Sequence, residues 1–281
     1  MILKKDNLKV IITASHNFSV PTFILINLLK KNNIKISGII IVSLFESKRI
    51  KRFINNKSFG YLLTLLNNLF LIKFKSNINS VSTFEKYKKN FCPALPSITN
   101  WCKKNKIKFT SVREINSQKA IDFLEMDNKK SIVIYSGGGI LKNKFLKSAS
   151  SVINAHAGPL PEIRGMNAAE WSALLGLRSE ITLHFIDSGI DTGKIIKTYS
   201  YDRTRCADVD ELRKVALIKG IEGIIDFLSN YEINIQNLKN TNPNPIHYQE
   251  RQYFTMSPLL RQLTNEKLKS QNHEKIFNNK A

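Results

Sequence analysis

Asn154 and His156 are separated by one residue at the end of an apolar run that begins at Ser151. In a β-strand such residues point to the same side of the pleat, so an amide and an imidazole would face one place. The segment Ala157 to Pro161 cannot continue regular structure because it holds a glycine and two prolines. We therefore expect the pair at the carboxyl end of a strand, where open α/β sheets bind their ligands.

An amide donates hydrogen bonds and an imidazole titrates near neutral pH, so this pair is suited to catalysis. The alternative is that His156 is a core histidine with its hydrogen bonds satisfied inside the protein, which is the commoner role of an isolated histidine near a strand end. The wider sequence context favours catalysis.

That context is a long pattern with two parts. The residues from Asn154 to Gly165 read NxHxxxLPxxRG, Trp171 follows, and the residues from Asp187 to Gly193 read DxGxDxG. In these motifs the sequence resembles the folate-dependent formyltransferase family, which includes methionyl-tRNA formyltransferase, glycinamide ribonucleotide formyltransferase and the amino-sugar formyltransferases. The resemblance extends roughly from Leu8 to Leu228.

The resemblance implies an enzyme that moves a formyl group from 10-formyltetrahydrofolate to an amine. By motif, the catalytic residues would be Asn154, His156 and Asp191. Attack by the amine creates a negative oxygen, for which Asn154 and His156 could supply donors. The amine loses a proton and the folate nitrogen gains one, so His156 and Asp191 could carry it, directly or through water. We expect Asp191 to raise the pKa of His156 and make it a better donor.

In the family, the folate ring is held largely by main-chain groups of two loops. The matching loops here predict the folate-binding residues Ser136, Gly137, Gly138, Gly139, Ile140, Asp187 and Gly189. The three consecutive glycines could also form a bare turn or a phosphate cradle, although neither GKS/T nor GxGxxG accompanies them. Asp187 is also interpreted as a turn-forming residue. No metal is expected, because the three cysteines show neither a CxxC pair nor zinc spacing.

Hydrophobic periodicity predicts a Rossmann-like α/β fold with a mostly parallel sheet. The helix expected at Pro21 to Lys31 lies between two β-branched runs, and a longer helix is expected at Ala207 to Leu228. Strands are expected at Leu8 to Thr13, Ile36 to Ser43, Ser131 to Tyr135, Ser151 to Ala155, Ile181 to Ile186 and Lys194 to Tyr201.

These elements predict a catalytic domain over residues 1–230, with a helical insertion at about 45–95 between the second and third strands. Residues 231–281 are predicted to form a short basic appendage without a full OB domain, because they are too few and show little strand alternation.

The chain has 43 Lys and Arg against 22 Asp and Glu, a formal charge of +21. This charge favours anionic partners such as sugar nucleotides or tRNA, although a coding bias toward Lys, Asn and Ile explains it equally well. The apolar stretch Phe59 to Ile72 is too short to span a membrane, so it is interpreted as a core helix, or otherwise as a surface-docking segment. We expect a cytoplasmic protein with no transmembrane span.

The acceptor amine is inferred from resemblances within the family. The residues Thr13 to Pro21 contain no glycine, unlike the phosphate loop of the purine enzymes, and Phe18 to Pro21 is similar to the methionyl-tRNA enzymes. The short C-terminal part instead favours a nucleotide-linked amino sugar as the acceptor. Initiator tRNA is the alternative, and a non-catalytic relative that binds RNA or another partner is a third.

Other candidate residues receive structural interpretations. Arg164 could bind an anion but is more typical of a residue that closes the LPxxRG turn, and Trp171 is expected in a helix core. The remaining histidines have no partner pattern and are assigned structural or surface roles: His16, His184, His247 and His273.

Overall fold

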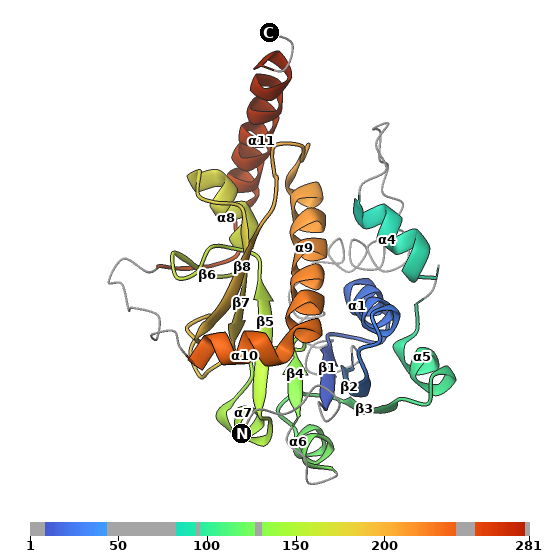
Figure 1. Cartoon of the computed structure of the whole chain (residues 1–281). Coiled ribbons are helices and arrows are strands. Elements are labelled where there is room, and N and C mark those ends of the chain that lie inside the picture. Colours follow the sequence, from blue (N-terminus) through green and yellow to red (C-terminus); the bar gives the residue numbers. More distant parts are fainter. Residues whose placement is uncertain (1–8, 44–82, 94–95, 127–130, 240–250, 279–281) are drawn as a thin grey trace, which may run out of the picture.

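A computed structural model describes residues 9–43, 83–93, 96–126, 131–239 and 251–278. Within these residues the centre of the fold is a seven-stranded sheet with the order β3-β2-β1-β4-β5-β7-β8 (Figure 1). Strands β1 to β5 are parallel to one another. Strand β7 is antiparallel to both of its neighbours, β5 and β8. The strands are β1 (Val10–Ala14), β2 (Ile36–Val42), β3 (Lys108–Val112), β4 (Ile132–Ile134), β5 (Ser151–His156), β7 (Glu180–Phe185) and β8 (Ile195–Ser200). The predicted mostly parallel α/β fold is confirmed.

Helices cover both faces of the sheet, which is why β1, β2 and β4 are almost entirely apolar. One core lies beneath α1 (Val20–Lys31), α4 (Thr83–Phe91), α5 (Ile98–Lys104) and α9 (Val209–Ser229). The other core lies beneath α6 (Gln118–Glu125) and α7 (Asn143–Ser148). Alternate residues of β1 pack in the two cores. Val10 and Ile12 belong to the first core, and Ile11 belongs to the second.

The first helix begins as the sequence predicts. The Ser19 hydroxyl accepts a hydrogen bond from the backbone N–H of Thr22, and Pro21 occupies the first turn. This cap satisfies one of the backbone donors that a helix start leaves unpaired. Because α1 begins directly after β1, its N-terminus is fixed beside the carboxyl end of that strand.

Three strands of the structure were not predicted from the sequence. Ser131 to Tyr135 was expected to be the third strand along the chain, but β3 (Lys108–Val112) comes earlier and pairs with β2. Only Thr110 and Val112 of this edge strand are buried, so it lacks the apolar run that identifies a central strand. The other two strands, β6 (Ile163–Gly165) and β9 (Arg251–Tyr253), have three residues each and form a separate small sheet.

Most of the predicted insertion, including Phe59 to Ile72, lies outside the described residues. Its described end, α4, packs between α1 and α9, where Phe84 is buried. Tyr87 donates its hydroxyl hydrogen to Glu222 of α9 at 3.0 Å, and Lys214 of α9 lies 3.7 Å from Glu85. This end of the insertion is therefore part of the helical layer.

The C-terminal part contains α10 (Tyr231–Lys239), β9 and α11 (Pro258–Asn278). Strand β9 pairs with β6, and α11 packs against α8 (Ala168–Leu175) and α9 (Figure 1). Residues 251–268 therefore lie directly on the core, at the edge that carries β6 and α8. Among the described helices, none combines the length and the apolar composition required to cross a membrane.

Candidate active site

Asn154 and His156 lie in the last three residues of β5. The antiparallel neighbour β7 places His184 opposite Asn154 in the ladder. The loop 187–193 then joins β7 to β8 and carries Asp191 back toward the end of β5. The sequence-predicted position of the pair, at the carboxyl end of a strand, agrees with the structure.

Four side chains meet at this point, and we call them the histidine–aspartate cluster: Asn154, His156, His184 and Asp191. His156 Nδ1 lies 3.4 Å from one carboxylate oxygen of Asp191, and His184 Nε2 lies 3.5 Å from the other. Asn154 Nδ2 lies 3.2 Å from His184 Nε2. Asp191 adopts a left-handed backbone with φ of 53°, a conformation that side chains other than glycine adopt rarely. The three residues named from the motif are thus in one cluster.

The sequence analysis missed His184, which it assigned a structural or surface role. His184 is only 1% exposed and lies between Asn154 and Asp191. Its Nδ1 is 2.8 Å from the carbonyl of Phe185, so Nδ1 carries the hydrogen and Nε2 accepts one from Asn154. The sequence did carry a signal for His184. It is a histidine in the mostly apolar run Ile181 to Ile186, which directly precedes the DxGxDxG turn.

Two main-chain groups of β6 complete the cluster. The carbonyl of Ile163 is 2.8 Å from His156 Nε2, so this nitrogen is the donor. The backbone N–H of Gly165 donates to Asp191 Oδ2 at 2.8 Å. The short strand therefore contacts both the imidazole and the carboxylate.

Two opposing effects act on the pKa of His156. The side chain is 6% exposed, and its burial lowers the pKa; the neighbouring Asp191 raises it, as predicted, but by less. The net shift is downward, so His156 is neutral at pH 7. Burial also raises the pKa of Asp191, but His184, His156 and the Gly165 N–H together lower it below its usual range.

The loop predicted to bind folate begins at Ser136, directly after β4. Gly137, Gly138 and Gly139 have φ of 99°, 129° and 110°, which other residues adopt only with strain. The Thr13 hydroxyl ties the loop to β1, because it donates to the Gly137 carbonyl and accepts from the Ser136 N–H. The loop thus presents its main chain at the strand ends, and Ile140 at its end is 74% exposed.

The second predicted folate loop is shaped by Asp187. One oxygen of this carboxylate accepts hydrogen bonds from the Gly189 N–H at 3.0 Å and from the Thr192 hydroxyl at 2.6 Å. Asp187 therefore has the turn-forming contacts expected of it. Neither Asp187 nor Gly189 lines the cleft that contains His156.

A cleft of about 480 Å³ contains several of these residues. Its polar lining includes Asn154, His156, Ser136, Asn167, Glu170 and Arg213. Its apolar wall is built by small or aliphatic side chains that include Leu25, Ala169, Ala216, Leu217 and Ile221. Among the described residues, no group of His, Cys, Asp and Glu side chains could hold a metal ion.

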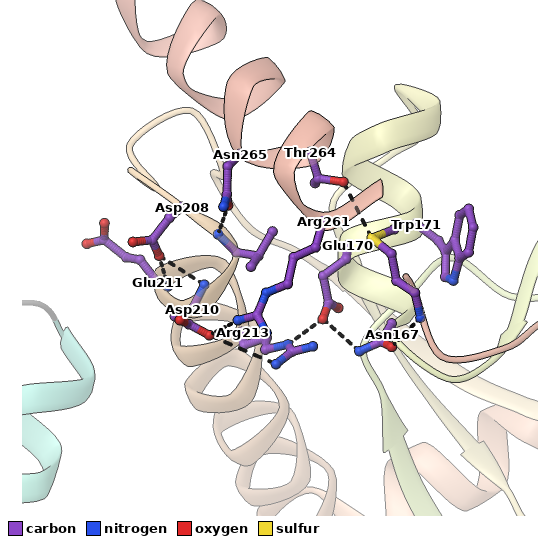
Figure 2. Close-up of polar contacts among 12 residues, drawn as sticks. Asn167, Glu170, Trp171, Asp208, Asp210, Glu211, Arg213, Arg261, Thr264 and Asn265 are labelled. Carbon is purple, nitrogen blue, oxygen red and sulfur yellow. Dashed lines mark hydrogen bonds and ion pairs between the residues drawn. The ribbon is translucent and has the colours of Figure 1, made fainter. Parts of the chain in front are cut away.

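Glu170 is a buried carboxylate that lines the cleft, and it is only 2% exposed. One of its oxygens accepts hydrogen bonds from Asn167 Nδ2 at 2.8 Å and from Arg213 Nε (Figure 2). Asp210 lies 3.9 Å from Arg213 and also accepts a hydrogen bond from Arg261 of α11. The Glu170–Arg213 pair is thus held between α8, α9 and α11.

The fold and this site define a class: an α/β protein with an amide, imidazoles and a carboxylate gathered at the carboxyl end of β5. The sequence profile of the family described as "Formyl transferase" matches residues 74–224, more than half of the chain. The chain belongs to the formyl transferase family.

The chain is similar to methionyl-tRNA formyltransferase from Finegoldia magna, with 25% identity over 134 residues. That match covers 47% of this chain and 43% of the relative, so the chain matches less than half of the relative's length.

Two solved structures have a similar fold. A sugar N-formyltransferase from Shewanella sp. superposes with a TM-score of 0.52 and 11% identity, over 93% of this chain and 87% of that one. Glycinamide ribonucleotide transformylase 1 from Symbiobacterium toebii gives a TM-score of 0.51 and 12% identity, over 80% of this chain and 88% of that one. At these identities the similarity concerns the fold alone.

Proposed function

We propose that this protein transfers the formyl group of 10-formyltetrahydrofolate to a primary amine, with Asn154, His156 and Asp191 as its catalytic residues. The observation that carries the proposal is the histidine–aspartate cluster at the cleft. An imidazole and an amide line the cleft, and the Asp191 carboxylate lies 3.4 Å from that imidazole. Family membership supports the reaction type.

Asn154 is suited to stabilise negative charge. One hydrogen of its amide is used by His184, and the second is available to the cleft, since a primary amide carries two donors. Because His184 and the strand fix the orientation of this amide, it needs little reorganisation when an oxygen in the cleft gains charge. Asn154 therefore acts as the oxyanion donor.

His156 is suited to accept the proton that the amine loses. It is neutral at pH 7 because burial lowers its pKa, and its Nε2 hydrogen is directed at Ile163. The unprotonated Nδ1 faces Asp191, so a proton that arrives there forms an ion pair with the carboxylate. Asp191 thus stabilises the protonated imidazole until the proton passes to the departing folate nitrogen.

The loop 136–139 supports a folate as the formyl donor, which supplies the carbon that is transferred. Ser136 and Gly137 line the same cleft as Asn154 and His156. A loop of glycines with positive φ leaves its main-chain N–H and C=O groups uncovered by side chains, as binding of a flat heterocycle by backbone groups requires. We propose that Ser136 to Ile140, together with the loop of Asp187 and Gly189, hold the folate.

The acceptor is proposed to be a nucleotide-linked amino sugar. The cleft holds Glu170 and Arg213, so one hydroxyl could donate to the carboxylate and accept from the guanidinium. Sugar rings offer such hydroxyls, and the formal charge of +21 suits the diphosphate of a sugar nucleotide.

A second acceptor, methionyl-tRNA, is favoured by a different observation. The sequence relative named above is a methionyl-tRNA formyltransferase, and the apolar wall of Leu25, Leu217 and Ile221 would accommodate an unbranched thioether side chain. The basic composition would equally suit a nucleic acid.

The test is to incubate the purified protein with 10-formyltetrahydrofolate and either a panel of nucleotide-linked amino sugars or charged initiator tRNA. Release of tetrahydrofolate is followed, with His156→Ala as the control for contaminating activity. Turnover with the sugar nucleotides supports the first acceptor, and turnover with tRNA alone replaces it by the second. A protein that binds no folate and turns over neither acceptor would be a non-catalytic relative.

A further inference from the structure

Residues 251–267, which we call the C-terminal strap, contain β9 and the first half of α11. We infer that the C-terminal strap positions the histidine–aspartate cluster by holding β6, and that Asn167 and Trp171 are the positioning residues that fasten it. This inference rests on the proposed catalytic role of the cluster. It assigns a function to a segment far from the catalytic motifs in the sequence.

Strand β6 supplies the main-chain contacts of the histidine–aspartate cluster. Its Ile163 carbonyl and Gly165 N–H are the main-chain partners of His156 and Asp191. Within the described residues, β6 belongs to a two-stranded sheet whose other strand is β9. The backbone that holds the cluster therefore has the C-terminal strap as its strand partner.

The C-terminal strap approaches β6 closely. The register pairs Ile163 with Arg251 and Gly165 with Tyr253, and the Met166 N–H donates to the Tyr253 carbonyl at 2.9 Å. A Cβ atom on Gly165 would lie 2.2 Å from that carbonyl oxygen, so only glycine allows this approach. The two strands are thus in direct backbone contact next to the Asp191 partner.

Two side chains fasten the C-terminal strap to α8 and its N-terminus. Asn167 Oδ1 accepts a hydrogen bond from the Met256 N–H at 3.0 Å. Trp171 Nε1 donates to the Phe254 carbonyl at 2.9 Å, and its ring lies 5.0 Å from that of Tyr253. Both side chains bind main-chain groups of the strap immediately after β9.

The far end of the C-terminal strap is fixed to the core. Arg261 donates to Asp210, and Asn265 accepts from the Val209 N–H at 2.9 Å (Figure 2). Lys267 donates to the Leu174 carbonyl at 2.8 Å. The C-terminal strap therefore connects β6 to α8 and α9 through hydrogen bonds at both of its ends.

The inference is tested with Trp171→Phe, Asn167→Gly and the double variant. Phenylalanine keeps the ring against Tyr253 but removes the donor to Phe254. Glycine tolerates the left-handed backbone of Asn167, where φ is 54°, and removes both the acceptor for Met256 and the donor to Glu170. Asn33→Gly is the matched control, because Asn33 also has a left-handed backbone, with φ of 56°, and lies in the turn between α1 and β2.

Two nuclear magnetic resonance measurements on the substrate-free protein give the readout. Amide hydrogen exchange at Met166 reports whether the C-terminal strap is still paired with β6. The titration of the His156 ring reports the cluster. We expect faster exchange in the double variant, together with a rise of the His156 pKa toward its ordinary value as the cluster opens to water. Asn33→Gly should change neither.

Activity provides a third readout. Trp171 does not line the cleft, so Trp171→Phe should lower kcat with little effect on folate affinity, measured with 5-formyltetrahydrofolate as the probe. A displacement of about 1 Å at a catalytic group can cost about 100-fold in rate, which is the loss expected for the double variant.

Two outcomes would overturn the inference. Fast exchange at Met166 with an unchanged His156 titration would mean that the cluster does not depend on the C-terminal strap. Slow exchange at Met166 in the double variant would mean that Asn167 and Trp171 do not fasten it. Because neither measurement needs an acceptor, a failure of the proposed formyl transfer would appear separately, as missing turnover in a protein with a normal His156 titration.

Discussion

Two carboxylates belong to the site, and they differ in the groups that contact them. Asp191 lies between His156 and His184, whereas Glu170 is held by Arg213 and Asn167. An imidazole gains and loses a proton near neutral pH, but a guanidinium keeps its charge at any physiological pH. The Asp191 pair is therefore suited to proton transfer, and the Glu170 pair to a fixed pattern of donors and acceptors. Both can serve one reaction, because His156 and Glu170 line one cleft.

The largest effect should come from Asp191→Asn, which removes the charge that stabilises a protonated His156. We expect kcat to fall by about 10³-fold, within the range for general acid–base catalysis. Glu170→Gln is the matched isosteric change at the other carboxylate and should mainly raise the KM for the acceptor. Initial rates of tetrahydrofolate release would distinguish the two. Equal losses of kcat in both variants would remove the distinction between the carboxylates.

The next largest effect is expected for Asn154→Ala. This variant lacks the amide donor, and kcat should fall by about 100-fold, as for the loss of one oxyanion donor. Folate affinity should remain unchanged when measured by binding of 5-formyltetrahydrofolate. A higher folate dissociation constant with an intact kcat would instead make Asn154 a binding residue.

A smaller effect is expected for Arg213→Lys, which keeps the charge but loses the planar guanidinium that can bind Glu170 and a ligand together. The KM for the acceptor should rise about 10-fold, the loss of roughly one hydrogen bond to a charged group, with kcat retained. Arg178→Lys is the control, since Arg178 forms an exposed ion pair with Glu162. An unchanged KM would place the acceptor elsewhere in the cleft.

The smallest effect concerns pH. Because burial lowers the pKa of His156, which must be neutral to accept a proton, kcat/KM should decline only below the ordinary histidine value of about 6.5. In Asp191→Asn the decline should begin at still lower pH, because the carboxylate that raises this pKa is absent. The measurement is the pH profile of both proteins. A decline that moves to higher pH in the variant would contradict this assignment.

The sequence predicted the parts of the fold that depend on local pattern. The β-branched runs of β1 and β2 and the proline at the start of α1 lie where they were expected. The strand β9 was missed because its residues Arg251 to Tyr253 carry no apolar alternation, and pairing with β6 determines its structure. Tertiary contacts of this kind leave almost no local signal.

The positions of the candidate catalytic residues were predicted from the motifs, but the net shift of the His156 pKa was not. Asn154, His156 and Asp191 lie together as the motif resemblance implied, but the direction of the His156 pKa depends on how deeply the ring is buried. Burial is a property of the whole fold, so spacing alone could not give it. His184 was missed for a related reason, because its contact with Asn154 follows from the antiparallel register of β5 and β7.

The pairing of β6 with β9 has a consequence for protein synthesis. Met256 lies 89 residues after Asn167, so the ribosome adds the partner of β6 long after the catalytic motifs have emerged. Contacts this distant in sequence form slowly and late. If the proposed role of the C-terminal strap holds, a nascent chain that already displays Asn154, His156 and Asp191 stays inactive until residues 251–267 have been translated and docked.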